Sequence, residues 1–101
     1  MIHVIASIQV KEGKMAQFIE IFKGNIPNVL QEEGCIEYFP TVDVQTGLPP
    51  QDYNQNVATI IEKWRSLDDL KAHLAAPHML NYKEKVKDIV EGMSVKVLAE
   101  A

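Results

Sequence analysis

Cysteine is almost absent from this chain. Cys35 is the single cysteine among 101 residues, so no disulfide can form within the chain and no metal site made of several thiolates can be built. A lone free thiol is typical of proteins in a reducing compartment. We therefore expect the protein to act in the cytoplasm.

The sequence also has no excess of positive charge. Its 10 Lys and Arg residues are outnumbered by 14 Asp and Glu residues, which gives a formal net charge of −4. Proteins that bind nucleic acid need a basic surface to replace the counterions of the phosphate backbone. The one local group of lysines, Lys83, Lys85 and Lys87, alternates with Glu84 and Asp88, which is typical of the solvated side of a helix. No nucleic-acid partner is expected.

Long hydrophobic runs are missing as well. A helix needs roughly 18 or more consecutive apolar residues to span a bilayer, and no stretch of the sequence provides them. Residues Met1–Val4 lack the basic segment and the apolar run of a secretory signal. We expect neither a membrane span nor a cleaved leader.

The composition that remains is that of one folded domain. Hydrophobic residues make up 47% of the chain and charged residues 24%, which is the balance of ordinary globular proteins. A chain of this length has room for a single domain, residues 1–101. Because so short a domain buries a modest fraction of its surface when it folds alone, a second subunit would stabilise it.

Four segments have the pattern of β-strands. Apolar residues recur with a period of two in residues 2–10 and 35–42, and a run rich in β-branched residues covers residues 56–64. A fourth strand is predicted over residues 93–98. The connection between the second and third strands contains Gln45–Asp52, a stretch of turn-forming residues that ends the strand pairing.

The first helical region follows the first strand. Its apolar residues switch to helical spacing, as Met15, Phe18, Ile19, Phe22 and Ile26. Proline inside a helix removes a hydrogen-bond donor and clashes with the preceding turn, so we expect a kink or a restart near Pro27. Gly34 is expected to end this helix as its C-terminal cap.

The second helical region lies between the third and fourth strands. Ser66, followed by Asp68 and Asp69, is typical of a helix start, because the serine oxygen caps an early amide and acidic groups favour the positive end of the helix dipole. Pro77 divides this region from a further helix over residues 78–90. The order β-α-β-β-α-β is the split βαβ arrangement. We therefore predict an α+β, ferredoxin-like fold with an antiparallel sheet.

Both faces of the predicted sheet carry apolar residues. A sheet with one solvated face shows a clean alternation of apolar and polar residues, and these strands show it only in part. The residues that we assign to the face away from the helices are Ile5, Phe39, Ile60, Trp64 and Leu98. The simplest cover for this second face is the same face of another copy, so we expect a homodimer that encloses an apolar pocket.

Three segments carry a resemblance to a known family. The segments EGCIEY (33–38), EKWRS (62–66) and AHLAAPHM (72–79) come in the order and spacing of the antibiotic biosynthesis monooxygenase family. Within it, the chain is most similar to the bacterial quinol monooxygenases, over residues 1–98. The resemblance implies a dimeric α/β barrel whose substrate is a quinol or a related electron-rich aromatic compound, oxidised by O₂. In several members this reaction needs no flavin or metal, so no cofactor is expected.

Metal and haem sites are not indicated. The histidines do not have the spacing of a tetrahedral metal site. The resemblance also counts against haem, because the haem-degrading members carry an iron-binding histidine where this chain has Lys83.

Two histidines are candidates for a catalytic base. His78 follows Pro77 at a helix start, where the backbone amides favour a neutral imidazole that can accept a proton. His73 lies beside an apolar stripe of the preceding helix and can reach the rim of a pocket. Removal of a quinol proton suits a base with a pKa near neutrality. The alternatives are local bonds of His78 to the backbone and a boundary position for His73.

Five further residues are candidates for binding the substrate. Trp64 is large enough to form a wall for an aromatic ligand or to fill the core. Tyr38 and Tyr82 can each hold a phenolic hydroxyl over a buried ring, and Asn25 can bind a quinol oxygen. Glu62 lies two residues before Trp64 on the same side of its strand. Its carboxylate is either an alternative base with a raised pKa or one half of a salt bridge.

The function that the resemblance implies is a monooxygenase that needs no cofactor. Two alternatives stay open. One is an isomerase of a phosphorylated dione, which the same scaffold hosts in the superfamily and which needs cationic groups for the phosphate. The other is a dimer that binds a small ligand without catalysis, because a fold by itself does not determine a function.

Overall fold

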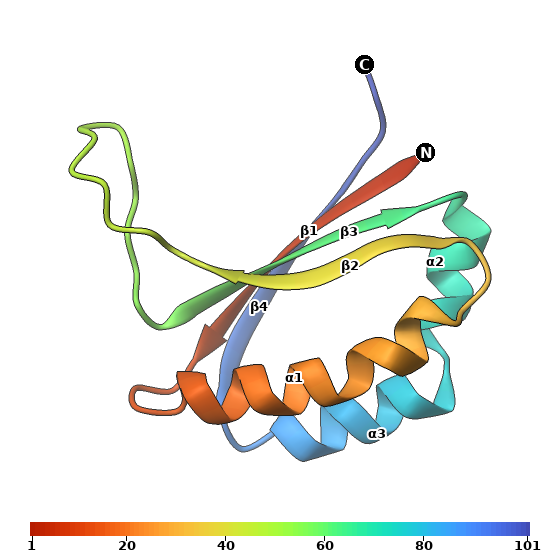
Figure 1. Cartoon of the computed structure of the whole chain (residues 1–101), viewed down its shortest axis with the longest axis horizontal. Helices are drawn as coiled ribbons and strands as arrows, with labels where there is room; N and C mark the ends of the chain where they lie inside the picture. The colour runs from red at the N-terminus through yellow and green to blue at the C-terminus, as the bar shows by residue number, and fades with distance from the viewer.

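The computed structural model describes all residues from 1 to 101, which form a sheet of four strands with helices on one side (Figure 1). The strands are antiparallel and their order across the sheet is β2-β3-β1-β4. The predicted ferredoxin-like α+β fold is therefore confirmed. In chain order, the elements are β1 (Ile2–Val10), α1 (Met15–Leu30), β2 (Cys35–Val42), β3 (Val57–Trp64), α2 (Leu67–Leu74), α3 (Pro77–Val86) and β4 (Val90–Leu98).

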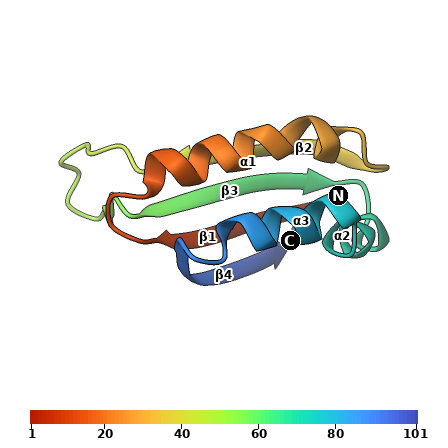
Figure 2. The ribbon, with the colours of Figure 1, turned by 90° about the horizontal axis from the view of Figure 1, so that it is seen from below.

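The sheet has one buried face and one face open to solvent. The central pair β1 and β3 is in register with Val4 opposite Glu62 and Ala6 opposite Ile60. These residues point toward the helices, because successive side chains of a strand alternate between its faces. Figure 2 shows the helices in front of this buried face. The core is therefore a single layer of side chains between the sheet and the helices.

The assignment of apolar residues to the second face was wrong for two residues. Ile60 and Trp64 lie on the helix-covered face, where they are 2% and 0% exposed. Ile5, Phe39 and Leu98 do lie on the open face, as predicted. The error arose because both faces of β3 carry β-branched residues, so the alternation does not distinguish them.

Helix α1 continues through Pro27 without a restart. An interior proline destabilises a helix by about 3 kcal/mol, and burying one large apolar side chain stabilises the fold by roughly 1.5–3 kcal/mol. Phe18, Phe22 and Val29 are buried on both sides of the proline, so one continuous buried face outweighs the lost hydrogen bond. The helix ends at Leu30 with Gln31 as its cap, so the prediction that Gly34 caps it was wrong.

Gly34 has a different role, in the turn between α1 and β2. Its φ of +80° lies in the left-handed region, which glycine adopts without a steric penalty. A Cβ atom at this position would overlap the carboxylate of Asp69. Gly34 therefore allows the turn to pack directly against the start of α2.

The second helical region is divided as predicted. Ser66 caps α2 by accepting a hydrogen bond from the backbone N–H of Asp69 at 3.2 Å, and Pro77 occupies the first turn of α3. Helix α3 ends at Val86, four residues before the predicted end, and β4 begins at Val90 rather than Met93. The chain leaves the helix early because Val90 already pairs with β1. None of the helices combines the length and the hydropathy needed to cross a membrane.

Candidate active site

An apolar cavity of about 580 Å³ lies between the sheet and helices α2 and α3. It exists because the inward face of β4 is only partly covered: Met93, Val95 and Val97 pair with buried residues of β1 and are still about half exposed. Fifteen of its 19 lining residues are hydrophobic, which favours an apolar ligand. The lining is formed by Val4, Ala6, Ile8, Phe22, Tyr38, Ile60, Glu62, Leu70, His73, Leu74, Met79, Tyr82, Lys83, Val86, Lys87, Val90, Met93, Val95 and Val97.

Four of the predicted site residues meet in this cavity. His73 comes from the last turn of α2, Tyr38 from β2, Glu62 from β3 and Tyr82 from α3. The sheet and both helices thus each supply a polar group to an otherwise apolar wall. Such a small set of convergent polar groups is typical of a site that orients a ligand.

His73 is held by an aromatic and a polar contact. Its side chain is 2% exposed, and its ring centroid lies 4.6 Å from that of Trp64 and 5.4 Å from that of Tyr38. Its Nδ1 atom lies 2.9 Å from Oε2 of Glu32. Burial lowers the pKa of His73, with the carboxylate of Glu32 opposing that shift. The environment therefore favours a neutral imidazole.

The second ring nitrogen of His73 borders open space. The only hydrogen bond of this side chain is the one from Nδ1, and no fully buried side-chain nitrogen or oxygen lacks a partner. Because His73 lines the cavity, we infer that Nε2 faces it. A ligand in the cavity can therefore reach Nε2.

Glu32 is a site residue that the sequence analysis missed. It lies in the turn between α1 and β2, and its Oε2 atom contacts Nδ1 of His73 at 2.9 Å and Nε2 of His78 at 2.7 Å. The turn is tied to α1 by the bond from the Glu32 N–H to the Val29 carbonyl at 2.9 Å. Forty-one residues separate Glu32 from His73, and no local pattern in the sequence relates them.

Glu62 is the second polar group of the cavity with a changed acidity. Its side chain is 8% exposed, and burial raises its pKa. Its Oε1 atom accepts a hydrogen bond from the indole N–H of Trp64 at 2.9 Å. The prediction that both side chains point the same way is confirmed, but the partner of the carboxylate is an indole rather than a cation.

Trp64 itself lies behind the cavity. It is fully buried and does not belong to the lining. It supports the site from the core, by donating to Glu62 and by packing on His73. Of the two roles considered for Trp64, the structure favours core packing.

The two tyrosines form an aromatic group with Phe22. The rings of Phe22 and Tyr38 are stacked at 5.1 Å, and Tyr82 meets Phe22 edge-on at 5.7 Å. Burial raises the pKa of both tyrosines, so their hydroxyls keep their hydrogens. No fully buried side-chain oxygen lacks a hydrogen-bond partner, so neither hydroxyl is fully enclosed by the protein.

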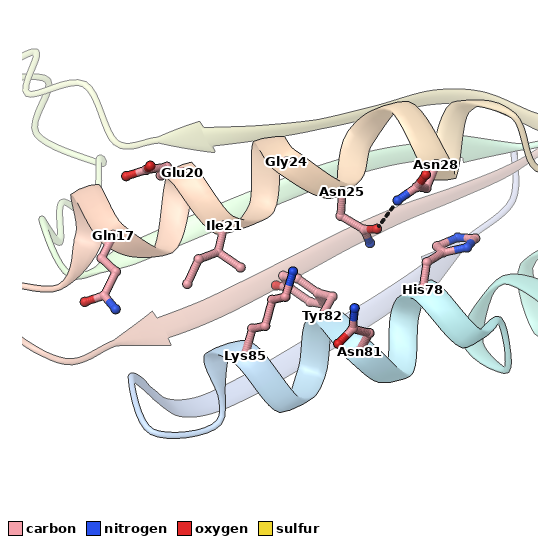
Figure 3. A pocket seen from close by; sticks show the side chains of 10 residues that line it. All are labelled: Gln17, Glu20, Ile21, Gly24, Asn25, Asn28, His78, Asn81, Tyr82 and Lys85. Carbon is pink, nitrogen blue, oxygen red and sulfur yellow. Dashed lines mark hydrogen bonds between the residues drawn. The ribbon is translucent and has the colours of Figure 1, made fainter.

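His78 and Asn25 lie in a different depression. A polar groove of about 450 Å³ lies between α1 and α3 and is lined by these two residues and by Tyr82 among others (Figure 3). Asn25 donates to the sulfur of Met79 at 3.4 Å and accepts from Asn28 at 3.1 Å. Neither His78 nor Asn25 lines the apolar cavity. Only Tyr82 contributes to both depressions.

Cys35 is not a reactive thiol. Burial raises its pKa to about 11, with further contributions from Glu32 and Glu62. The thiolate is the nucleophilic form, so this side chain is a poor nucleophile. No group of three or more His, Cys, Asp or Glu side chains is arranged to hold a metal ion.

Comparison with known proteins identifies the family. The sequence profile described as "Antibiotic biosynthesis monooxygenase" matches residues 1–85. A protein of Escherichia coli strain K12 named "Probable quinol monooxygenase YgiN" is 38% identical over 100 residues, which cover 97% of this chain and 96% of the relative.

Solved structures show the same fold. A conserved protein from Methanosarcina mazei Go1 has a TM-score of 0.85 at 24% identity, with 99% of this chain and 92% of that chain covered. The protein SO0527 from Shewanella oneidensis has a TM-score of 0.81 at 26% identity, with 96% and 87% covered. The chain therefore belongs to the antibiotic biosynthesis monooxygenase family.

Proposed function

We propose that this protein is a cofactor-independent monooxygenase that oxidises a quinol or a related electron-rich aromatic compound with O₂. The observation that carries the proposal is the buried His73, whose Nε2 atom borders an apolar cavity of about 580 Å³. This volume lies within the roughly 300–1,000 Å³ of small-molecule sites. The name of the E. coli relative, "Probable quinol monooxygenase YgiN", supports the same activity.

His73 acts as the general base in this proposal. The neutral imidazole accepts one hydroxyl proton of the quinol at Nε2, which leaves a quinol anion in the cavity. Tyr38 and Tyr82 donate hydrogen bonds to the quinol oxygens, and Phe22 contributes an aromatic surface for the ring. Glu62 is a second acceptor beside the substrate. His78 does not line the cavity, so we assign it no direct contact with the substrate.

The oxidation then proceeds between the anion and O₂. One electron passes from the anion to O₂, and the resulting semiquinone and superoxide join as a peroxide on a ring carbon. The imidazolium returns its proton to the outer peroxide oxygen. The O–O bond then breaks. The outer oxygen leaves as part of a water molecule, which also takes the hydrogen of the ring carbon, and the inner oxygen stays bound to the ring. One quinol and one O₂ thus give one hydroxyquinone and one water.

A dimer completes the proposed architecture. Ile5, Phe39 and Leu98 lie on the open face of the sheet, where Phe39 is 41% exposed and Leu98 42%. Ile61 is opposite both Ile5 and Phe39, so Ile5, Ile61 and Phe39 form one continuous apolar strip. We infer that the same strip of a second copy covers it, as a dimeric α/β barrel. The free thiol of Cys35 fits the proposed location in the cytoplasm.

One observation favours a second candidate function. Lys83 and Lys87 line the cavity. Lys87 pairs with Glu84 at 2.6 Å, whereas Lys83 makes no ion pair. A free ammonium group beside an apolar cavity suits a substrate with an anionic group, such as the phosphorylated dione of the isomerase alternative. A dimer that binds its ligand without turnover is the other alternative.

Oxygen uptake separates these functions. Purified protein freed of metal and flavin is mixed with a reduced naphthoquinol, and O₂ consumption is followed above the rate of autoxidation. We expect excess consumption with one water formed per O₂ and a hydroxylated quinone as the product. Absence of excess consumption with every quinol and anthrone tested would eliminate the monooxygenase.

A further inference from the structure

Two histidines share one carboxylate oxygen at the edge of the site. Oε2 of Glu32 lies 2.9 Å from Nδ1 of His73 and 2.7 Å from Nε2 of His78. An ionised carboxylate only accepts hydrogen bonds. Each ring nitrogen that contacts this oxygen therefore carries a hydrogen. For His73 this nitrogen is Nδ1.

The position of that hydrogen determines whether Nε2 of His73 has a lone pair or a hydrogen on the side of the cavity. A neutral imidazole has one N–H, and the bond made by one nitrogen sets the state of the other. With its hydrogen on Nδ1, His73 presents the lone pair of Nε2 to the cavity. We propose that Glu32 is a positioning residue that holds His73 in this tautomer, an inference that rests on the proposed role of His73 as the base.

The surroundings of Glu32 keep its carboxylate in place. Its side chain is 14% exposed, and the second bond, from His78, holds the same oxygen from the side of α3. The turn that carries Glu32 is attached to the segment between β3 and α2 by the bond from the Arg65 N–H to the Gly34 carbonyl at 2.8 Å. The carboxylate is thus fixed by α3 and by the turn, and His73 is oriented against it.

The same carboxylate stabilises the base after it has accepted a proton. The imidazolium of His73 then lies against a negative charge at 2.9 Å, in the way that a buried carboxylate supports the histidine of a catalytic triad. Other groups around His73 act on its charge too. His78 and Lys83 on α3 lower its pKa, and Glu62, Tyr38 and Tyr82 face the same cavity from β3, β2 and α3.

The tautomer can be measured without any substrate. ¹⁵N NMR of the imidazole nitrogens, recorded at a pH where His73 is neutral, assigns the hydrogen to Nδ1 or Nε2. We expect Nδ1–H in the native protein and in the control Glu33→Gln, because Glu33 is a neighbouring exposed carboxylate that pairs with Arg65. In Glu32→Ala we expect a substantial population with Nε2–H. An Nε2–H tautomer in the native protein overturns the proposal even if the alanine variant does not fold.

A second experiment tests the charge of Glu32. Glu32→Gln can place an amide oxygen at the position of Oε2, which keeps an acceptor for both histidines and removes the negative charge. We expect kcat to fall by roughly 10–100-fold, the size of effect found for carboxylates that orient metal-bound histidines. The acid limb of kcat/KM should move to lower pH, because the carboxylate raises the pKa of His73. Glu33→Gln should leave both unchanged.

These results distinguish two kinds of failure. An unchanged acid limb in Glu32→Gln, or an unchanged tautomer in Glu32→Ala, refutes the role of Glu32. An Nδ1–H tautomer in a protein that consumes no O₂ with any quinol refutes the proposed monooxygenase and leaves the assignment of Glu32 standing.

Discussion

At the residue scale, burial controls the ionisable groups of the cavity. His73 and Glu62 both lie in apolar surroundings, which disfavour the charged form of each. Burial lowers the pKa of the imidazole and raises the pKa of the carboxyl group. Burial thus favours the neutral form of both groups.

The first prediction concerns His73 and pH. A base has to be neutral to act, so kcat/KM should rise with pH through the pKa of His73, which lies below the usual value of 6.5. Replacing His73 with Gln should lower kcat by roughly 10²–10⁴-fold, the usual contribution of a general base. The measurement is O₂ uptake as a function of pH.

The control for His73 is the same substitution at His3, which lies on the strand β1 away from the cavity lining. His3→Gln should retain the native rate and pH profile. Full activity in His73→Gln would show that another group is the base.

The second prediction concerns Glu62 and stability. Its pKa is raised in the folded protein, so the unfolded chain loses this proton at a lower pH than the folded protein does. The folded protein is therefore destabilised as pH rises from the pKa of the unfolded state through the pKa of the folded state. Glu62→Gln keeps an oxygen for Trp64 without this destabilisation. The unfolding free energy of the variant minus that of the native protein should therefore increase as pH rises through this range.

Urea denaturation at several pH values and a fixed protein concentration measures this difference. Glu37→Gln is the control, because the carboxylate of Glu37 is 46% exposed and pairs with Lys63. A constant difference between Glu62→Gln and the native protein at all pH values would contradict the raised pKa.

At the scale of elements, the turn between α1 and β2 has to approach α2 closely to bring Glu32 to His73. Gly34 makes this approach possible, because any Cβ there would overlap Asp69. Asp69 is itself engaged, with Ser66 at 2.9 Å and with Arg65 at 3.4 Å. The contact between turn and helix is therefore a condition for the site.

The third prediction separates this contact from backbone strain. Gly13 and Gly34 have nearly the same φ, +79° and +80°, but Gly13 has nothing within 4 Å of its Cβ position. Gly13→Ala should cost about 1–2 kcal/mol, the penalty of the left-handed conformation. Gly34→Ala should cost more, because Asp69 must also move. Equal losses of unfolding free energy in both variants would contradict the close contact.

At the scale of the whole molecule, the fourth prediction concerns the dimer. Ile61→Lys places a charge in the middle of the apolar strip on the open face of the sheet. We expect this variant to sediment as a monomer while the native protein sediments as a dimer. Leu80→Lys, at an exposed position of α3, is the control and should stay dimeric. A native protein that is monomeric at all concentrations would refute the dimeric barrel.

The order of elements could be predicted from the sequence because each element has its own local signal. Alternating apolar residues, the Ser66 cap and Pro77 at a helix start all act within a few residues. Errors arose where tertiary contacts outweigh local preference. Helix α1 passes Pro27 because its buried face continues, and β4 begins at Val90 because β1 offers a partner there.

The candidate site was predictable only in part. His73, Tyr38, Tyr82 and Glu62 were selected from the sequence, and the structure brings them into one cavity. His78 and Asn25, selected with equal reason, lie in a separate groove. Nothing in the sequence distinguishes the two groups, because the distinction depends on which side of α3 and α1 each side chain occupies.

By itself, the sequence determined the family, the order of strands and helices and the apolar character of the core, since these follow from residue types and their spacing. Only the tertiary structure decided that Glu32 meets two histidines 41 and 46 residues away. The physical reason is that a hydrogen bond depends on positions in space to within a few tenths of an ångström, and the packing of the turn on α2 and α3 sets those positions.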